Sequence, residues 1–369
     1  MKAPTVYDVA AHAGVSIATV SRVLSRPGDV RESTRQRVLT SVRELGYVPS
    51  GAARGLAARR TGVLGLYFPG FDAIDTIDEA LFDGDGGVTV RPDLGGGSDA
   101  RPLNLYFDEV LRGAELEAWR RGFVLLVGVG RGDQADGTVR DMAGRVDGLL
   151  VLARSVPDET LTQLSRRVPI VIIAGSPRGD DFDHVSVSNT EGMHALTTHV
   201  LDALGPGGPP LYVAGPEGSP DDEERRSGFA AALSERGIDP ATATLVRGEF
   251  TRASGRLVGE ATLAGPVRPR AIICANDQMA LGVMDAMANA GIEIPAEILV
   301  TGFDGIEAAA LSTPRLTTIR QPMHDLGRAA IQVMARRLDD PTLPPRSIRL
   351  PVEVLLREST EPTGPARSY

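Results

Sequence analysis

The chain has 369 residues, of which 42% are hydrophobic and 24% charged, and this balance excludes a disordered or fibrous protein. It has no apolar run of membrane-spanning length and no signal-peptide core, and its single cysteine excludes an internal disulfide framework, so we expect a cytoplasmic protein. The net charge of −9 is uneven: the first 60 residues carry ten Lys and Arg against four Asp and Glu, a net +6, and the remainder carries −15. A basic head on an acidic body is typical of a phosphate-binding module attached to a domain that does not bind nucleic acid.

Residues 5–24 predict two short helices joined by a tight turn. Thr5 and Asp8 have the spacing of a capping box at the start of the first helix. Gly14 can adopt the left-handed conformation that the turn requires, and Ser16 can cap the second helix. Helices joined in this way form a helix-turn-helix unit, whose second helix fits the major groove of DNA. The alternative is a helical hairpin without a ligand, but caps, turn and apolar faces all agree with the DNA-binding unit.

A third helix and a basic linker follow. Val38, Val42 and Leu45 recur at helical spacing, and Gly46 is placed to end the helix, so the headpiece should contain three helices. The next stretch, 50–60, is rich in Ala and Arg and contains one large apolar residue, Leu56. Its composition fits either a segment that folds on DNA and wedges Leu56 into the minor groove or a flexible linker.

From Thr61 the sequence alternates between apolar runs and helical patterns, which predicts an α/β fold with parallel sheets and crossover helices. The number of these units indicates two doubly wound lobes, with ligands bound at the carboxyl ends of the strands. The pattern predicts an amphipathic helix over 106–121, and strands over 63–68, 123–129, 146–152, 169–174, 211–214, 271–275 and 298–303.

Polar residues at the expected strand ends predict a binding cleft. Asn276 and Asp277 follow one strand and Asp304 follows another, while Arg225 begins a segment expected to open a helix facing the same space. Carboxylate, amide and guanidinium groups suit a hydroxyl-rich or charged ligand. Asn276 and Asp277 could instead cap the following helix, and we favour that role for Asp277. The five histidines show no metal-binding spacing, so we expect neither a metal nor another cofactor.

Along its length, the sequence contains several longer motifs in one order: TVYDVAAHAGVSIATVSRVLS, ELGYVPSGAARGLA, VDGLLVL, ERRSGF, ICANDQMALGVMDAMANAGIEIPAEILVTGFDG and LTTIRQP. With these motifs, the chain resembles the LacI/GalR family of bacterial transcriptional repressors over residues 4 to about 357. The resemblance implies a homodimer whose headpieces read adjacent half-sites of a near-palindromic DNA operator. It also implies a periplasmic-binding-protein-like core, in which a small-molecule effector moves the lobes and changes DNA affinity.

The resemblance also implies roles for individual residues. Those expected to face base edges are Ile17, Ala18 and Arg22, with Arg22 on a guanine. Those expected to contact phosphates are Thr5, Ser16, Thr19, Ser21, Thr34 and Tyr47. In the hinge, Ala53 and Leu56 are expected to contact DNA, with Leu56 as the wedge. The expected effector-binding residues are Phe107, Arg225, Asn276 and Asp304, and the effector class suggested by the family is a sugar or related metabolite.

The expected domain boundaries follow from the same match. The headpiece spans 1–48, the hinge helix or linker 49–61, the core 62–357 and the tail 358–369. Within the core, we expect a first lobe of about 62–189 and 320–344 and a second lobe of about 190–319 and 345–357. Because the tail has no heptad repeat, we expect a dimer without the coiled coil that makes some family members tetrameric.

Three departures from the family pattern leave the effector class open. An acidic, Gly-rich segment between Pro69 and Leu103 replaces a short turn and should form a loop at the mouth of the cleft. Residues 173–175 and Leu152 are apolar where many members are polar, so the first lobe offers fewer polar partners. The segment 131–145 is short and contains two glycines, so its usual helix should be trimmed or absent.

Other classes of protein explain the sequence less well. A solute-binding transport protein would share the core but would need export, and the headpiece would have no role. An enzyme could use the same cleft, but the sequence has no GxSxG, P-loop or post-strand GxGxxG motif and no metal cluster, so we expect no catalysis. An architectural DNA binder would leave the ligand-cleft fold unexplained.

Overall fold

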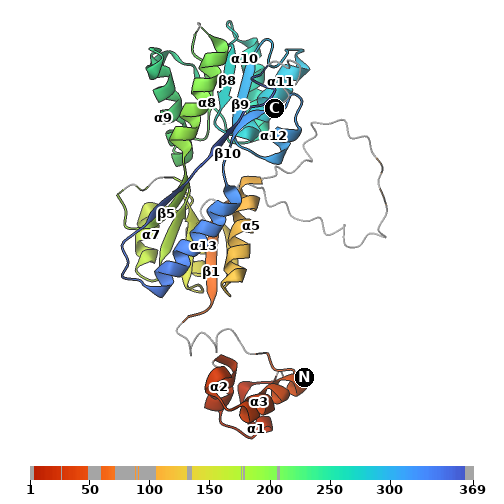
Figure 1. The fold of residues 1–369 in the computed structure, drawn as a ribbon, viewed down its shortest axis with the longest axis vertical. Helices are drawn as coiled ribbons and strands as arrows, with labels where there is room; N and C mark the ends of the chain where they lie inside the picture. Colours follow the sequence, from red (N-terminus) through yellow and green to blue (C-terminus); the bar gives the residue numbers. More distant parts are fainter. Residues whose placement is uncertain are drawn as a thin grey trace, which may run out of the picture. The chain divides into compact units, whose positions relative to one another are not determined.

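The computed structural model describes residues 4–25, 27–48, 60–70, 88, 90, 105–130, 135–175, 177, 179–205 and 208–361. The chain divides into two compact units, one of Met1–Val63 with Arg145–Asp147 and one of Leu64–Gly144 with Gly148–Tyr369. The first unit contains the basic headpiece and the second contains the α/β core (Figure 1).

The headpiece is the three-helix unit that the sequence predicts, and its caps are the predicted ones. The side chain of Thr5 accepts from the Asp8 N–H, and Asp8 in turn accepts from the Thr5 N–H. Gly14 has the left-handed φ of 62° that the turn requires. A small core formed by side chains from all three helices holds the unit together. The helices are α1 (Val6–Ala13), α2 (Ile17–Ser25), a short 3-10 helix η1 (Pro27–Asp29) and α3 (Glu32–Leu45).

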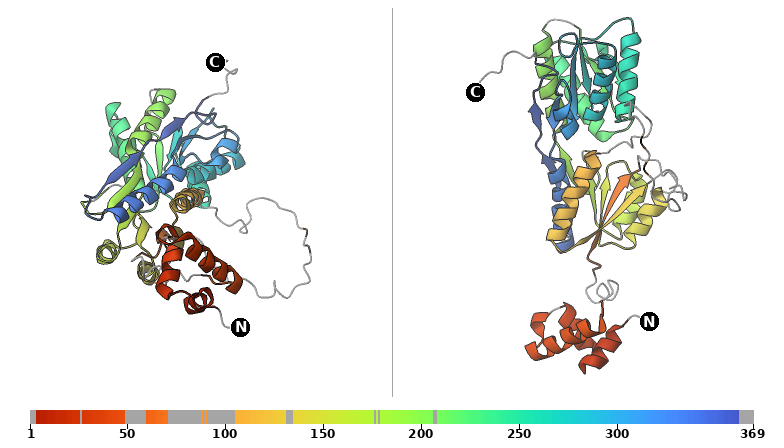
Figure 2. Two further views of the ribbon diagram at one scale, coloured as in Figure 1. Left: turned by 60° about the horizontal axis from the view of Figure 1, so that its bottom comes forward. Right: turned by 90° about the vertical axis from the view of Figure 1, so that its right-hand side faces the viewer.

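The first lobe of the core is a six-stranded sheet in the order β11-β5-β4-β3-β1-β2. Helices α5 and α13 cover one face and helices α6 and α7 cover the other (Figure 2). The apolar cluster under α6 and α7 is confined to this lobe, and the one under α5 and α13 continues into the second lobe. The strands are β1 (Val63–Pro69), β2 (Val124–Gly130), β3 (Gly148–Leu152), β4 (Ile170–Ile173), β5 (Asp183–Val187) and β11 (Ser347–Leu350); the helices are α5 (Leu105–Arg120), α6 (Ala135–Ala143), α7 (Asp158–Ser165) and α13 (Met323–Asp339).

The second lobe has a matching six-stranded sheet in the order β12-β10-β9-β8-β6-β7, in which only the pairing of β10 with β12 is described as antiparallel. The strands are β6 (Leu211–Ala214), β7 (Leu245–Arg247), β8 (Ala271–Cys274), β9 (Leu299–Asp304), β10 (Thr317–Arg320) and β12 (Glu353–Leu355). The helices are α8 (Asn189–Leu204), α9 (Pro220–Glu235), η4 (Pro240–Thr242), α10 (Arg252–Ala264), α11 (Asp277–Asn289) and α12 (Glu307–Leu311). Two parallel-dominated doubly wound lobes are thus confirmed.

The lobe boundaries near the C-terminus differ from those expected. Strand β11 pairs with β5 in the first lobe, although 345–357 was expected to belong entirely to the second. Ser359 and Thr360, placed in the tail by the sequence, are buried in the second lobe. The Ser359 hydroxyl donates to the Val300 carbonyl (2.6 Å) and the Thr360 hydroxyl lies 2.7 Å from that of Thr317. Their hydroxyls complete hydrogen bonds of β9 and β10, so the core extends past residue 357.

Two helices bear on the expectations for this part of the chain. Helix α9 begins at Pro220, five residues before Arg225, because Ser219 caps it and Pro220 supplies the first-turn proline. Helix α6 forms over Ala135–Ala143 despite its internal glycine, so of the two expected outcomes, a trimmed or an absent helix, the structure has the short helix.

The α10–α11 pair in the second lobe depends on glycines that allow backbones to touch. A Cβ built on Gly282 would lie 2.0 Å from the carbonyl oxygen of Arg252 on the facing helix. A Cβ built on Gly255 would lie 2.1 Å from the carbonyl oxygen of Met279. No larger residue fits at either position without moving the helices apart.

Replacing Gly282 with Ala is therefore expected to lower the free energy of unfolding by about 1–3 kcal/mol, because the added methyl group overpacks the helix contact. Urea unfolding of the full chain measures the change. Gly137→Ala in α6 is the matched control, since a Cβ there meets no atom within 4 Å and the change should stabilise the helix by roughly 0.5–1 kcal/mol. Equal effects at the two positions would contradict the close packing.

Candidate functional site

The second helix of the headpiece presents an exposed face. Ile17, Ala18 and Arg22 are exposed, while Val20 and Val23 on the opposite face are buried in the headpiece core. The Ser16 hydroxyl caps this helix by accepting from the Thr19 N–H at 3.2 Å. The three side chains expected to face base edges thus lie on one exposed surface of α2.

The residues expected to contact phosphates are less uniform. Thr5, Thr19, Ser21 and Thr34 are partly exposed and Ser16 is exposed. Tyr47 is only 9% exposed and packs in the headpiece core, so most of its ring is unavailable to DNA. Tyr7, which the sequence analysis did not select, is 67% exposed on α1. Ala53 and Leu56 lie outside the described residues, as does most of the acidic segment between Pro69 and Leu103.

In the core, Arg225 is the centre of a buried polar cluster. Its Nε donates to Asn189 Oδ1 at 2.9 Å and its Nη1 donates to the Ala275 carbonyl at 2.7 Å. Nη1 also lies 3.8 Å from Asp304 Oδ1, and the guanidinium carbon lies 3.7 Å from the centre of the Phe303 ring. The ion pair, the two hydrogen bonds and the face of the aromatic ring together stabilise the positive charge of the Arg225 guanidinium. Without them, its removal from water would be strongly unfavourable.

Asp304 lies at the end of β9 and is buried. Its Oδ1 accepts from Gln321 Nε2 at 2.7 Å. Burial raises the pKa of Asp304 from 3.8 to about 6; Arg225 and then Gln321 oppose this rise, and the charge of Asp221 adds to it. The two groups expected from different segments, Arg225 and Asp304, are therefore brought together.

Asn276, and not Asp277, caps the helix that follows β8. Asn276 caps α11, since its Oδ1 accepts from the Met279 N–H at 3.0 Å, and its Nδ2 donates to the Phe250 carbonyl at 3.0 Å. Asp277, favoured as the cap, instead accepts from the N–H groups of Gly305 and Ile306 (2.8 and 2.9 Å) and from the Thr318 hydroxyl. It lies one residue inside the helix, from where its carboxylate reaches the loop after β9.

Three aromatic side chains of the first lobe pack against one another. The Phe107 ring on α5 lies 5.2 Å from that of Phe68 at the end of β1 and 5.3 Å from that of Tyr106. Burial raises the pKa of Tyr106, the charges of Asp221 and Asp304 raise it further, and Arg225 opposes them. Tyr106 thus lies in the electrostatic field of the second-lobe cluster.

Sequence reasoning missed Tyr106 and three polar residues of this cluster, Asn189, Asp221 and Gln321. Asn189 follows β5 and Gln321 follows β10, and neither strand was predicted, so neither residue could be placed at a strand end. Asp221 lies in the first turn of a helix whose start was predicted too late. The Ser-Pro start signal of α9 was the available clue for Asp221.

Backbone strain also concentrates at this edge of the sheets. Within the described ranges, four residues other than glycine have positive φ angles: Arg154 and Ala174 (both 66°), Phe250 (58°) and Asp304 (123°). They lie at or shortly after the carboxyl ends of β3, β4, β7 and β9. Strained conformations of this kind persist where the surroundings hold them, commonly at ligand sites.

The raised pKa of Asp304 predicts a pH effect on stability. Because the folded state holds the proton up to about pH 6 and the unfolded state only up to about 3.8, the stability that this proton provides is complete below pH 3.8. It is lost as the pH rises through 6. As the pH falls from about 7 to about 5, the free energy of unfolding of the wild type, measured with urea, should therefore rise relative to that of Asp304→Asn. A constant difference would contradict the raised pKa.

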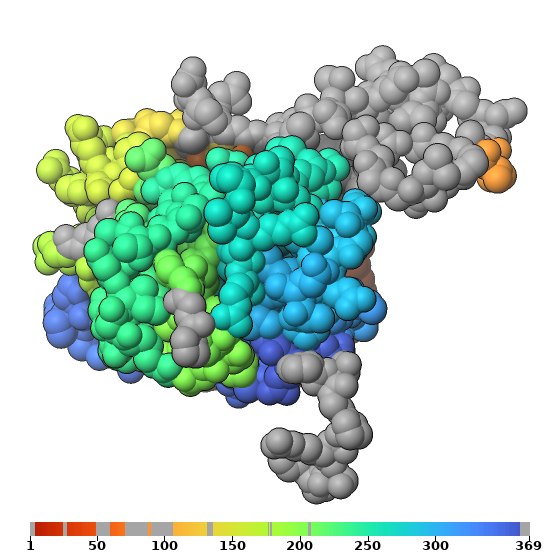
Figure 3. All heavy atoms as spheres, turned by 90° about the horizontal axis from the view of Figure 1, so that it is seen from above, coloured from red at the N-terminus to blue at the C-terminus, as the bar shows by residue number. Residues whose placement is uncertain are grey.

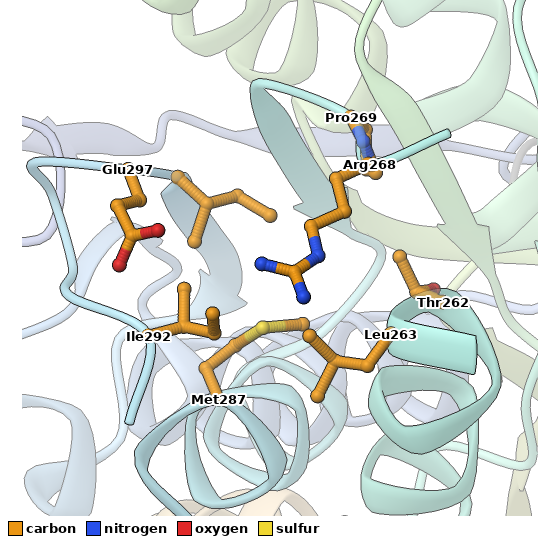
Figure 4. Close-up of a pocket in the computed structure, with 8 residues that line it drawn as sticks. Thr262, Leu263, Arg268, Pro269, Met287, Ile292 and Glu297 are labelled. Carbon is orange, nitrogen blue, oxygen red and sulfur yellow. The ribbon is translucent and has the colours of Figure 1, made fainter. Parts of the chain in front are cut away.

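Two surface hollows lie elsewhere on the second lobe. One, of about 70 Å³, lies at the amino ends of β8 and β9, opposite the edge that carries Asp304, with Arg268 directed over Met287 (Figure 4). The other, of about 430 Å³, lies between α9 and the segment leading into β7. Figure 3 shows the second lobe from its outer end. Neither hollow is lined by residues of the Arg225 cluster.

Two kinds of site are not found in the described part of the chain. No group of three or more His, Cys, Asp or Glu side chains there could hold a metal ion. Among the same residues, no helix is long and apolar enough to cross a membrane.

Comparison with known proteins matches both units. Residues 5–50 match the model described as bacterial regulatory proteins, lacI family, and residues 211–360 match the periplasmic binding protein-like domain. The ribose operon repressor of Escherichia coli (strain K12) is 30% identical over 94% of this chain and 96% of its own length. The lac repressor dimer bound to operator and the anti-inducer ONPF is 25% identical with a TM-score of 0.78, covering 97% of this chain and 99% of that one.

A complex of the transcriptional regulator CelR with cellobiose is also similar, at 27% identity and a TM-score of 0.65, covering 96% of this chain and 99% of that one. These likenesses extend over the headpiece and both lobes. Together with the exposed face of α2, the recognition helix, they identify this protein as a DNA-binding transcriptional regulator. The chain belongs to the lacI family of bacterial regulatory proteins.

Proposed function

We propose that the protein is a cytoplasmic, homodimeric repressor that binds a near-palindromic operator and responds to a hydroxylated, carbohydrate-like effector held between its lobes. It acts by binding, without catalysing a reaction. The observation that carries the proposal is the coexistence of an exposed recognition helix and a buried cluster of Arg225 and Asp304 at the strand ends of a two-lobed core.

On the DNA side, the exposed residues of α2 have suitable chemistry. Arg22 supplies a fork of donors that matches guanine O6 and N7, and Ile17 and Ala18 can contact thymine methyl groups. Partly exposed Thr19, Ser21 and Thr34 can donate to phosphates and set the register. A small headpiece of this kind binds weakly alone, so two joined copies provide affinity and half-site spacing.

Exposed apolar side chains at one edge of the first lobe support the proposal of a homodimer. Strand β2 is the last strand of its sheet, and its Val124 is 64% exposed. Trp119 at the end of the neighbouring helix α5 is 78% exposed. Exposed apolar side chains gathered on a strand edge and an adjacent helix are typical of an interaction surface.

The cleft chemistry favours a hydroxylated effector. Asp304, Asp221 and Arg225 can accept from and donate to neighbouring hydroxyls, while Phe107 and Tyr106 offer apolar ring surface from the first lobe. Carboxylates opposite aromatic rings suit a sugar ring, which has hydroxyl edges and apolar faces. Two similar proteins support this proposal. One is named a ribose operon repressor, and the other, CelR, is in complex with cellobiose.

The test is a thermal-unfolding screen of the full chain with D-ribose, cellobiose and a panel of other mono- and disaccharides, repeated on Asp304→Ala. A sugar is expected to raise the unfolding temperature of wild type and to have no effect on the variant, because ligands that bind only the folded state stabilise it. Glu307→Ala, a change of an exposed acid on α12, is the matched control and should respond as wild type does. A nucleobase or organic acid that acts where every sugar fails would refute the carbohydrate assignment.

A further inference from the structure

A chain of hydrogen bonds connects the first lobe to the effector cluster of the second. The N–H of Gly175, just after β4 in the first lobe, donates to Asp221 Oδ1 on α9 at 3.2 Å. Asn189 Nδ2 donates to the same oxygen at 2.9 Å, and Asn189 Oδ1 accepts from Arg225 Nε at 2.9 Å. Arg225 in turn lies 3.8 Å from Asp304. Asn189 therefore stands between a direct contact of the lobes and the charged pair of the cleft.

Asn189 also occupies one of the crossings between the lobes. Strand β5 of the first sheet ends at Val187, and Asn189 is the first residue of α8 in the second lobe. The Ser188 N–H between them donates to the Leu350 carbonyl of β11 at 3.0 Å, which fixes the crossing against the first sheet. A change in the angle between the two lobes therefore alters the backbone next to the Asn189 side chain.

The amide of Asn189 is held in one orientation. The side chain is buried, with 1% of its surface exposed. Its Nδ2 donates to two carboxylates, Asp221 and Glu224, each at 2.9 Å, while its oxygen faces the Arg225 guanidinium. Rotating the amide by half a turn would put its oxygen against two carboxylates and its NH2 against a cation, so neither side would be satisfied.

The contact at the first-lobe end is close. Gly175 has a φ of +70°, and a Cβ at this position would lie 2.8 Å from the Cβ of Pro220. The first lobe thus makes this bond with its backbone, at a point where the two lobes touch. The surrounding atoms leave little free space there. A small movement of Asp221 therefore changes the geometry of the hydrogen bond between its Oδ1 and the Gly175 N–H.

From this arrangement, which rests on the effector site described under Proposed function, we infer that Asn189 is a positioning residue that couples the state of the Arg225–Asp304 pair to the contact between the lobes. A ligand hydroxyl that engages the pair moves the guanidinium. Because Arg225 Nε is bonded to one end of the planar Asn189 amide and Asp221 to the other, the movement reaches Asp221 and the Gly175 N–H. Asn189 acts through Arg225 at one end of its amide and through Asp221 at the other.

The test is a double-mutant cycle read by residue-level hydrogen–deuterium exchange at Gly175, in the full chain without DNA or ligand. Asp304→Asn removes the charge opposite Arg225 and so perturbs the pair directly. It is expected to change the Gly175 exchange rate by about tenfold in the wild-type background and by less than about twofold in the Asn189→Ala background. Glu223→Ala, the removal of an exposed acid from the first turn of α9, is the control and should leave both the rate and the coupling unchanged.

A second variant keeps the test decisive if Asn189→Ala does not fold. Asn189→Asp retains the acceptor for Arg225 but replaces the donor to Asp221 with a repelling carboxylate, and it should abolish the coupling equally. An Asp304→Asn effect of the same size in both backgrounds, or no effect in the wild-type background, overturns the inference. Because the cycle uses no sugar, a failed sugar screen with intact coupling would refute only the effector class, and the reverse result would refute only the role of Asn189.

Discussion

Arg22→Ala is expected to weaken binding to the specific operator by about 10- to 100-fold, because it removes a bidentate contact to a base edge. Arg22 is exposed on the outer face of α2, while Val20 and Val23 hold the inner face in the headpiece core. The substitution should therefore leave the headpiece folded. Fluorescence anisotropy at fixed salt, with operator and with scrambled DNA, measures the two affinities.

The loss of affinity should fall mainly on the operator. Arg43→Ala, on the exposed surface of α3, removes the same charge without touching the recognition face and serves as the control. It should lower the affinities for operator and scrambled DNA by similar small factors. An Arg22→Ala variant that loses affinity equally for both DNAs would show that Arg22 contacts phosphate and not a base.

Asp277→Ala is expected to lower the free energy of unfolding of the core by about 3–5 kcal/mol. The carboxylate is fully buried and accepts from the N–H groups of Gly305 and Ile306 and from the Thr318 hydroxyl. Removing it leaves three donors without partners in a site closed to water and releases the loop that follows Asp304. Urea unfolding monitored by circular dichroism measures the change.

Asp285→Ala on the same helix is the matched control. Its carboxylate is 36% exposed and pairs with Arg252, itself half exposed, at 2.7 Å. A surface ion pair of this kind contributes at most about 1 kcal/mol. Similar losses for the two variants would mean that the three donors find other partners when Asp277 is absent.

Local signals were sufficient to predict the headpiece. Thr5, Gly14, Ser16 and Gly46 act as cap or turn residues, and these local roles depend only on near neighbours in the sequence. The buried strands of the core were found for a similar reason, since continuous apolar runs such as 271–275 need no partner to be recognised.

The missed strands are short and polar. Strand β5 reads DHVSV and β10 reads TTIR, and each is held in place by neighbouring strands and by helix packing that the sequence alone does not display. Two polar residues of the Arg225 cluster were missed for the same reason, because Asn189 lies two positions after β5 and Gln321 directly follows β10. Asp277 was misassigned because its partners, Gly305, Ile306 and Thr318, are distant in sequence and become neighbours only when β8, β9 and β10 pair.

The most direct test of the account is selection of bound sequences from a random DNA pool by the purified full chain, at a stated salt concentration. We expect a near-palindromic motif whose half-sites contain a guanine that Arg22 can read and whose spacing matches a dimer. Binding without a motif, repeated in the presence of a metabolite mixture that would supply any corepressor, would contradict the assignment of the protein as a sequence-specific repressor.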